Sequence, residues 1–432
     1  MAARRPESPP SAPESADFVV EGVASGGDGV VRAAQGPVFV PFVLPGERVR
    51  LGAPVRRGQA LGAPAELLEA SAERVVPVCQ HFFQCGGCRL QHWADAPYGA
   101  WKRGRVVSAL ARAGFGEAPV AELVAAGAGT RRRLDLAARR EGGRVLLGLH
   151  AARQDRVVDL VACPIAAPAL VALFAPLRAM LRGLDGFRRE AELHLNLLDT
   201  GPDLLIRAPC ELKAADRTRL AAFALAQGLA RIAWQAGRQA AEIAVQMSRP
   251  SIVFGGVGVT PPPGAFLQAS REAEAAIVAA VLAALPAKGA VLDLYAGVGT
   301  ISLPIANHHA VVAVEGDAAA CAALDAAARG AGGRVRVLRR DLARQPMMGP
   351  QLRGFAAVVL DPPYGGAREQ VAALAEAGIA SVVMVSCNPE ALARDAATLL
   401  AAGYGCAGAV PIDAFLWSAD VEAVAVFRRR AR

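Results

Sequence analysis

An alternation of apolar strand-like runs with helix-length segments is the most constraining feature of this sequence. The apolar runs occupy residues 291–294, 310–314, 334–338, 356–360 and 381–386, and helix-length segments separate most of them. Such alternation is typical of a parallel sheet covered by helices, because two parallel strands need a long crossover connection. The sequence therefore predicts a Rossmann-like, doubly wound α/β domain over residues 263–432.

Each apolar run leads into a polar or glycine-rich segment. The five endings begin, in order, with Asp293-Leu-Tyr-Ala-Gly-Val-Gly-Thr300, Glu315, Asp341, Asp361-Pro-Pro-Tyr364 and Ser386-Cys-Asn-Pro389. In open α/β sheets, ligands bind beyond the carboxyl ends of the strands. We therefore expect a ligand crevice at this edge of the sheet.

The glycine-rich ending favours a nucleoside cofactor. Gly297 and Gly299 permit a tight turn, and Glu315, 22 residues after Asp293, is placed to accept hydrogen bonds from ribose hydroxyls. These features fit a nicotinamide cofactor as well as S-adenosylmethionine. The third glycine of the dinucleotide fingerprint would fall at position 302, where this chain has Ser302. An acid that opens the loop suits a cationic sulfonium, so the sequence favours S-adenosylmethionine.

Two further residues follow from the same endings. Asp341 is expected to contact the adenine, with a solvated loop acid as the alternative. Cys387 comes just before a predicted helix in which Asn388 is the N-cap and Pro389 the first residue. A helix N-terminus favours a thiolate, so we expect a lowered pKa for Cys387 and a nucleophilic role. The alternative is a small buried cysteine that fills the strand end.

The remainder of the chain is predicted to form smaller units. Residues 1–16 are a tail rich in Pro, Ser and Ala that we expect to be disordered, and residues 17–68 alternate β-type runs with glycine turns, as in an OB-like β-barrel. Residues 69–262 mix strands and helices, which predicts an α+β central domain. A helix over about residues 97–114 could pack on the catalytic domain.

Size, charge and hydropathy limit the class of protein. At 432 residues, with 53% hydrophobic and 20% charged residues, the chain predicts about three folded domains. A net charge of +8 permits a polyanionic partner. Residues 131–133 and 428–430 are arginine-rich runs that are either phosphate contacts or solvated charge. The absence of an apolar signal or membrane segment predicts a cytoplasmic protein, and we expect a monomer.

Four cysteines are spaced as ligands of a metal centre. They are Cys79, Cys85, Cys88 and Cys163, enough for a tetrahedral zinc or a four-iron cluster. Zinc sites usually contain paired cysteines two to four residues apart, and a second Cys-x-x-Cys pair is missing here. The missing pair weakens the case for zinc, but the spacing alone leaves both a zinc ion and a four-iron cluster open.

The motifs together resemble those of a known family. Asp-Leu-Tyr-Ala-Gly-Val-Gly-Thr, Asp-Pro-Pro-Tyr, Val-Ser-Cys-Asn-Pro and the terminal Asp420-Val-Glu422 look like those of S-adenosylmethionine-dependent RNA 5-methyluridine methyltransferases. Residues 21–32, with the segments that follow, resemble the RNA-binding TRAM module, although an unrelated small barrel would share its turns. The branch resembled carries an iron–sulfur site and modifies bacterial 23S ribosomal RNA, and the resemblance extends from Phe18 to the C-terminus.

The resemblance implies a role for each site residue. Cys387 would add to uracil C6, Glu422 would remove the C5 proton, and Asp361 would orient the uracil or the methionine end of the cofactor. Gln268, Tyr295 and Thr300 fall on cofactor-contact positions. The four cysteines would hold a structural [4Fe-4S] cluster. The target uridine would have to be flipped out or single-stranded.

Three positions depart from the family pattern. They are Ser270, where the family usually has Asn, Tyr364, where it has Arg, and Asp420, where it has His. Two alternatives stay open, of which the departures favour the second. One is a transfer RNA uridine-C5 methyltransferase, and the other is a catalytically silent RNA-binding assembly factor.

Overall fold

The computed structural model describes residues 16–34, 36–51 and 65–430, which divide into two compact units. The first unit comprises Met1–Val78, Cys88–Tyr98 and Trp417–Ala419, and the second comprises Cys79–Gly87, Gly99–Leu416 and Asp420–Arg432. Of the tail expected over residues 1–16, residues 1–15 lie outside the described part, and Ala16 is the first residue of a strand.

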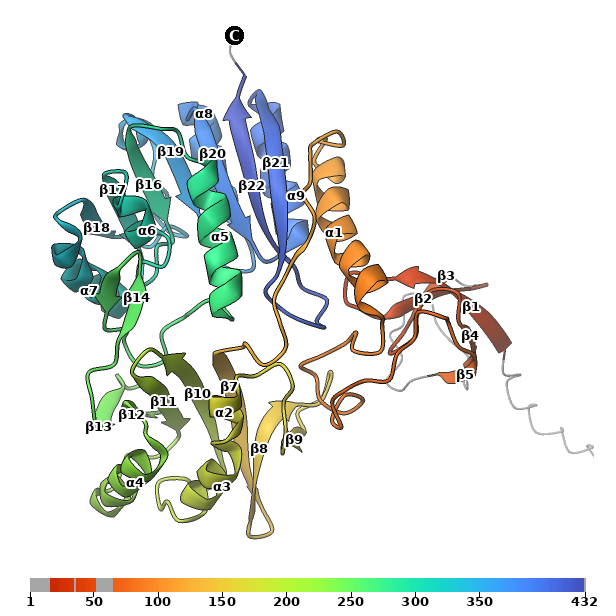
Figure 1. The fold of residues 1–432 in the computed structure, drawn as a ribbon, viewed down its shortest axis with the longest axis vertical. Coiled ribbons are helices and arrows are strands. Elements are labelled where there is room, and N and C mark those ends of the chain that lie inside the picture. Colours follow the sequence, from red (N-terminus) through yellow and green to blue (C-terminus); the bar gives the residue numbers. More distant parts are fainter. Residues whose placement is uncertain (1–15, 35, 52–64, 431–432) are drawn as a thin grey trace, which may run out of the picture. The chain divides into compact units, whose positions relative to one another are not determined.

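The first unit is built on a five-stranded antiparallel sheet of order β3-β2-β1-β4-β5 (Figure 1). Its apolar cluster includes Val20, Val31, Val38 and Val49, which alternate along the strands with exposed residues, as expected for a sheet with one buried face. The strands are β1 Ala16–Val23, β2 Gly29–Ala33, β3 Gly36–Val40, β4 Arg48–Leu51 and β5 Glu66–Glu69.

The second unit contains two large sheets, of which the central one has seven strands in the order β13-β12-β11-β10-β7-β8-β9. Helices α2, α3 and α4 pack on one face through Leu170, Phe174 and Leu220, and the strands contribute Leu193 and Trp234 to the same cluster. The other face carries polar side chains. The elements are β7 Arg133–Glu141, β8 Arg144–His150, β9 Val157–Asp159, α2 Pro168–Val171, α3 Phe174–Arg182, β10 Glu190–Leu198, β11 Gly201–Ala208, α4 Ala214–Gln227, β12 Arg231–Ala236 and β13 Glu242–Gln246.

The other sheet of this unit has eight strands in the order β18-β17-β16-β19-β20-β22-β21-β6. Strands β16 to β20 are parallel, and β22 runs antiparallel between β20 and β21. The strands are β6 Val124–Ala125, β16 Ala290–Leu294, β17 Val311–Glu315, β18 Val335–Arg339, β19 Phe355–Leu360, β20 Ser381–Ser386, β21 Tyr404–Asp413 and β22 Glu422–Arg429.

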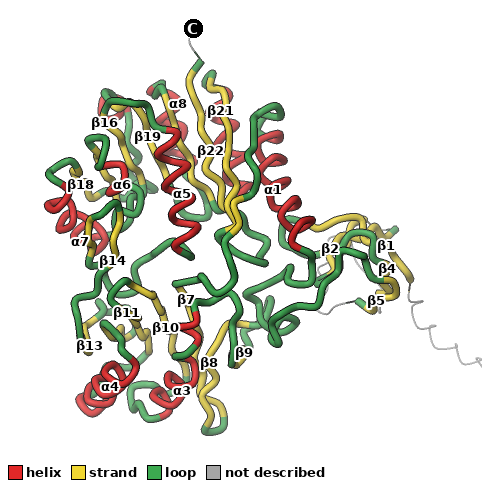
Figure 2. Tube along the Cα trace, in the orientation of Figure 1, coloured by secondary structure: helices red, strands yellow, loops and turns green. Residues whose placement is uncertain are grey.

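Helices cover both faces of this eight-stranded sheet (Figure 2). Ile277 of α5 and Leu324 of α7 belong to the apolar cluster on one face, and Val371 of α8 and Leu399 of α9 belong to the cluster on the other. Val106 of α1 joins the latter cluster. The helices are α1 Asp95–Arg112, α5 Arg271–Ala284, α6 Ser302–Ala306, α7 Ala318–Ala328, α8 Arg368–Ala377 and α9 Pro389–Ala401. The predicted parallel, doubly wound α/β architecture is confirmed.

The remaining elements are a hairpin of β14 Ile252–Phe254 and β15 Val257–Val259 and two 3-10 turns, η1 Arg329–Ala331 and η2 Gly349–Leu352. Across residues 16–34, 36–51 and 65–430, no helix combines the length and the apolar character that a bilayer crossing requires.

Candidate active site

The loop after β16 lies at the carboxyl ends of the parallel strands, where the sequence predicts a ligand crevice; we call this edge of the sheet the crevice. Tyr295 has a φ of +65°, and Gly297 and Gly299 have φ of +55° and +97°. A Cβ at Gly299 would lie 2.4 Å from the Leu324 side chain, so the loop can approach α7 only with glycine there. The Gly297 amide donates to Glu315 Oε2 at 2.9 Å. The structure thus brings the glycine loop and the Glu315 carboxylate of β17 together.

From the sequence, Asp293 was expected to open the loop as an acid suited to a cationic sulfonium, but in the structure its side chain is buried. Its carboxyl accepts a hydrogen bond from the Ser302 hydroxyl, and only 1% of the residue is exposed. Burial, together with the charges of Asp361 and Glu315, raises the pKa of Asp293 to about 7. Ser302, at the position of the missing third glycine, therefore supports this buried acid, and Asp293 lies behind the loop that it opens.

The other predicted cofactor residues lie around the same strand ends. Asp341 follows β18, is exposed, and accepts from the Ala343 amide at 3.0 Å. Its Cα is 3.5 Å from where a Cβ on Gly316 would lie, which places it beside the end of β17. Burial raises the pKa of Tyr295 to about 12, so this half-buried phenol stays protonated. Thr300 is half-buried at the end of the loop.

Two acids meet where β19 ends and β22 begins. Asp361 follows β19 and accepts a hydrogen bond from Gln268 Nε2 at 3.0 Å. Burial raises the pKa of Asp361 to about 7. Glu422 is the first residue of β22 and is 3% exposed, and its Oε1 has no hydrogen-bond partner. Its pKa is raised well above the usual value by burial and then by the charges of Asp361 and Asp420.

Cys387 lies next to these acids, at the end of β20. The cap is as predicted: Asn388 is the N-cap of α9, its side chain accepts from the Glu390 amide at 3.0 Å, and Pro389 is the first helical residue. The expected lowering of the pKa is wrong, however. Burial, together with the charges of Glu422 and Asp361, raises the pKa of Cys387 to about 12.

The correction has a simple physical reason. A helix terminus stabilises a charge by about 0.3–1 kcal/mol, whereas loss of water around a thiolate and neighbouring negative charge shift a pKa by several units. The crevice therefore holds Cys387 as a thiol. Within the described ranges, neither Asp361 nor Glu422 forms an ion pair with Lys, Arg or His. A cationic ligand would supply the missing positive charge and lower the pKa of all three groups.

The structure shows the surroundings of the three residues that depart from the family pattern. Ser270 is the N-cap of α5, and its hydroxyl accepts from the Ala273 amide at 3.1 Å. Tyr364 is 61% exposed, and its carbonyl accepts from Asn388 Nδ2 at 3.0 Å. Asp420 adds negative charge beside Glu422 and Cys387.

Helix α1 contributes two residues that the sequence reasoning did not single out as part of a site. Burial lowers the pKa of Arg105, while Asp420, Glu390 and Tyr364 act on it in the opposite direction. Lys102 is fully buried and donates to the Asp413 carboxylate at the end of β21 and to the Phe415 carbonyl at 2.8 Å. These partners lie some 300 residues apart in sequence, and Lys102 and Asp413 are separated by 311. No local pattern could have linked them.

Three of the four predicted metal ligands lie near one another within the second unit. Burial raises the pKa of Cys85, and the charges of Cys163 and Cys79 add to the shift, so these three thiols lie within electrostatic reach of one another. Cys88 belongs to the first unit. In the part of the chain that is described, no group of three or more Cys, His, Asp or Glu side chains is arranged to hold a metal ion.

The arginine run at residues 131–133 is not a uniform solvated patch. Arg132 is 2% exposed and donates through Nε to the Gln268 carbonyl at 3.1 Å and through Nη2 to the Glu274 carboxylate. It is therefore not available as a phosphate contact. Arg133 remains partly exposed.

The fold and the strand-end residues define a doubly wound α/β enzyme domain with a nucleoside crevice. Residues 273–398 match the family model "Conserved hypothetical protein 95". An RNA methyltransferase of Brucella suis described as uncharacterized is 43% identical over 418 residues, which cover 96% of this chain and 98% of that protein. The 23S rRNA (uracil(1939)-C(5))-methyltransferase RlmD of Aeromonas salmonicida is 32% identical over 435 residues, covering 98% and 99%.

A solved structure has the same fold over nearly the whole chain. The tRNA (uracil-54, C5)-methyltransferase of Pyrococcus abyssi, in complex with S-adenosyl-L-homocysteine, superposes with a TM-score of 0.73 at 20% identity, covering 95% of this chain and 99% of that one. From the similarity to the curated relatives, this chain belongs to the RNA methyltransferase family.

Proposed function

We propose that this enzyme transfers a methyl group from S-adenosylmethionine to C5 of a uridine in RNA, with 23S ribosomal RNA as the substrate. One observation carries the proposal: the Cys387 thiol and the Asp361 and Glu422 carboxyls gather at one edge of the sheet, close enough to shift one another's pKa. The names of the relatives agree with this chemistry.

The chemistry requires both a nucleophile and a base. Uracil C5 does not attack a methyl donor directly, so the Cys387 thiolate adds to C6 and forms an enolate whose C5 accepts the methyl group. Glu422 then removes the C5 proton, and β-elimination breaks the bond between sulfur and C6 and restores the thiolate. S-adenosylmethionine supplies the methyl group on a sulfonium. Because Cys387 rests as a thiol, its own proton has to leave first, and a bound cation next to the acids favours this loss.

The cofactor residues follow the edge of the sheet. We assign Glu315 to the ribose, because each of its oxygens accepts one backbone amide and retains further acceptor capacity. Asp341 is assigned to the adenine, and Gln268 and Asp361 to the methionine end or the uracil. The remaining assigned contacts are Tyr295, Gly297, Gly299 and Thr300.

The RNA must present an unstacked base, since C6 inside a helix is not accessible to a thiolate. Because the proposed substrate is ribosomal RNA, we propose that the enzyme acts in the cytoplasm. The five-stranded sheet of the first unit is assigned as a TRAM-like RNA-binding barrel.

We also propose that Cys79, Cys85, Cys88 and Cys163 hold a [4Fe-4S] cluster. The proposal is supported by the pKa values of Cys85 and Cys163, which burial and the charges of neighbouring cysteine thiols raise. No catalytic step is assigned to the cluster.

The decisive experiment compares Cys387→Ala with the native enzyme on RNA labelled with tritium at uridine C5. The variant should release no tritium above background, while its binding of S-adenosylhomocysteine remains within about threefold. Unchanged tritium release would refute the thiolate mechanism. If the native enzyme itself released none on ribosomal or transfer RNA, the silent RNA-binding factor would be the better description.

Two further measurements address the substrate and the metal. Mapping of 5-methyluridine in ribosomal and transfer RNA from a deletion strain would identify the substrate, and loss confined to transfer RNA would overturn the ribosomal assignment. An iron assay and an absorption spectrum of anaerobically purified protein would distinguish the cluster from zinc. Protein without iron would reject the cluster.

A further inference from the structure

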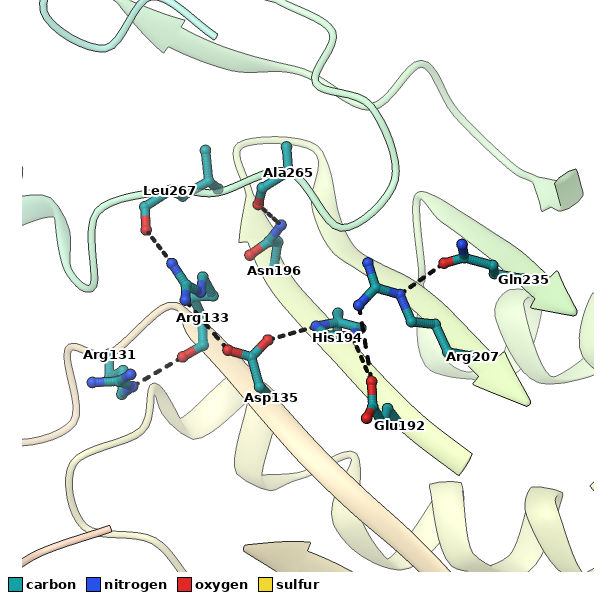
Figure 3. Close-up of polar contacts among 10 residues, drawn as sticks. All are labelled: Arg131, Arg133, Asp135, Glu192, His194, Asn196, Arg207, Gln235, Ala265 and Leu267. Atoms are coloured by element: carbon teal, nitrogen blue, oxygen red, sulfur yellow. Dashed lines mark hydrogen bonds and ion pairs between the residues drawn. The ribbon is translucent and has the colours of Figure 1, made fainter. Parts of the chain in front are cut away.

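A short irregular segment, residues 261–270, joins the central domain to α5 and carries Gln268; we call it the junction segment. Its backbone carbonyls are hydrogen-bonded from the central sheet. The Ala265 carbonyl accepts from Asn196 Nδ2 at 2.9 Å, and the Leu267 carbonyl accepts from Arg133 Nη1 at 3.3 Å (Figure 3). The Gln268 and Ala269 carbonyls accept from Arg132 Nε at 3.1 Å and from the Arg132 amide at 2.8 Å. The backbone on both sides of the Gln268 side chain is therefore held by strands of the other sheet.

The two outer donors lie opposite each other on neighbouring strands. Asn196 of β10 pairs in register with Arg133 of β7. Asn196 is only 2% exposed, and its Oδ1 has no hydrogen-bond partner, so the Ala265 contact is the one that its buried amide satisfies. A buried amide that leaves its oxygen unpaired costs stability. The hydrogen bond from Asn196 to the Ala265 carbonyl explains why an amide side chain is buried at this position.

Arg133 is itself held in place by a chain of polar contacts across the exposed face of the sheet, which we call the polar ladder. Its guanidinium donates to Asp135 Oδ2 at 3.3 Å and lies over the Phe266 ring at 4.4 Å from the centroid. Asp135 faces His194 in register, with 2.7 Å between Oδ1 and Nδ1. From His194 the ladder passes to Glu192, two residues away on the same strand β10. It then reaches Arg207 of β11, which faces Glu192, and Gln235 of β12, which faces Arg207 (Figure 3).

The acid in this ladder stays ionised at neutral pH. The hydrogen bond from His194, together with the charge and hydrogen bond of Arg133, outweighs burial and lowers the pKa of Asp135 to about 2. A permanently charged Asp135 keeps the Arg133 guanidinium between itself and the Leu267 carbonyl. The geometry at Leu267 is thus set by side chains of the central sheet.

We propose that Arg133 and Asn196 are positioning residues for Gln268, so that the central sheet sets the affinity of the crevice for the methyl donor. This inference rests on the proposed function, in which Gln268 and Asp361 lie at the donor site. The Gln268 carboxamide reaches Asp361 only if its backbone is correctly placed, and a displacement of about 1 Å is enough to weaken such a contact substantially. Neither residue has to touch the donor.

The test measures binding of S-adenosylhomocysteine by calorimetry without RNA. Arg133→Met removes the donors to Leu267 and Asp135, and we expect binding about tenfold weaker, in keeping with loss of a hydrogen bond from a charged group. Arg133→Lys restores one cationic donor and should recover part of the affinity. Asn196→Asp keeps the volume but opposes the Ala265 carbonyl with another acceptor, and should weaken binding to a similar extent.

Arg207→Met is the matched control. It makes the same substitution on the same sheet face but at the far part of the polar ladder, and it should leave donor binding unchanged. In steady-state assays, the positioning variants should raise the KM for S-adenosylmethionine and leave kcat at saturating donor within about twofold. The thermal unfolding midpoint of Arg133→Met should match that of the control, which excludes general destabilisation. Asn196→Asp buries an unpaired acid and should unfold at a lower temperature, so its binding is measured well below its own midpoint.

The outcomes separate the two claims. Native protein that binds S-adenosylhomocysteine while both Arg133→Met and Asn196→Asp bind it equally well would overturn the positioning role and leave the proposed function intact. Native protein that fails to bind S-adenosylhomocysteine would overturn the proposed function and this inference with it. If Arg133→Met does not fold, Arg133→Lys and Asn196→Asp decide the matter.

Discussion

Two regions of the second unit bury acids in opposite ways. In the central sheet, Asp203 is 2% exposed and accepts two hydrogen bonds from the Arg231 guanidinium, at 2.8 and 2.7 Å. Arg231 also donates to the Pro261 carbonyl at 2.9 Å, so both members of this ion pair are satisfied. In the crevice, Asp361 has a neutral amide as its partner, and Glu422 has one oxygen without a partner.

The contrast separates a structural acid from a functional one. Arg231 offsets part of the cost of burying Asp203, although burial still raises the pKa of that acid. The buried acids of the crevice have no cation to offset theirs, and acids with strongly raised pKa values cluster at functional sites. The crevice holds acids with raised pKa values, which a bound sulfonium would lower so that the acids ionise beside it. The central sheet carries charge that is already balanced, and its role toward the crevice is geometric.

The largest expected effect lies in the crevice. Glu422→Gln keeps the shape of the side chain but removes the base, so turnover to released 5-methyluridine RNA should fall by about 10³-fold, within the range of general base catalysis. The covalent complex between Cys387 and RNA should accumulate, which a denaturing gel with labelled RNA would detect. Turnover within tenfold of the native rate would assign proton removal to another group.

The second test compares the two kinds of acid by stability. Asp203→Asn leaves Arg231 buried without its counter-charge and should cost about 3 kcal/mol of unfolding free energy. Glu422→Gln removes an uncompensated buried acid and should leave the stability unchanged or higher. Denaturant unfolding measures both. Equal destabilisation by the two substitutions would contradict the distinction between a paired structural acid and an unpaired functional one.

The third test uses pH. The pKa of Asp361 is raised to about 7, so its carboxylate forms as the pH rises through that value, and binding of the cationic S-adenosylmethionine should strengthen several-fold between pH 6 and 8, as expected for one new neighbouring charge. S-adenosylhomocysteine, which lacks the sulfonium charge, should show a smaller change over the same range. Asp361→Asn should remove the difference between the two ligands, and its persistence would point to another titrating group.

The same pKa has a consequence for stability. Because the folded-state pKa of Asp361 lies above its unfolded value, the folded protein is favoured while the acid is protonated, below about pH 4. This contribution is lost as the pH rises through about 7. In Asp361→Asn, that part of the pH dependence should disappear from the unfolding midpoint.

The smallest expected effect is at Ser302. Ser302→Ala removes the hydroxyl that donates to Asp293 and should cost about 1 to 2 kcal/mol, as for other buried hydrogen bonds. The pKa of Asp293 should rise further, since that hydrogen bond lowers it. Ser302→Thr retains the hydroxyl and is the control. A null effect in both variants would show that Asp293 does not need the bond.

Much of the site was predictable because local patterns encode it. Periodic apolar runs specify parallel strands, and the residue after each strand has to lie at one edge of the sheet, so Glu315, Asp361 and Cys387 could be grouped from sequence. The cap of α9 is equally local, since Asn388 and Pro389 suit the first positions of a helix.

Only the tertiary structure decided the electrostatics and the long-range contacts. The pKa of Cys387 depends on burial and on Glu422, which comes from another strand, and these outweigh the helix terminus that the sequence revealed. Lys102 meets Asp413 across 311 residues, and Arg132 turned out to be buried against the junction segment. Solvent exclusion and charge at a distance belong to the packed molecule, so no local pattern in the chain could have specified them.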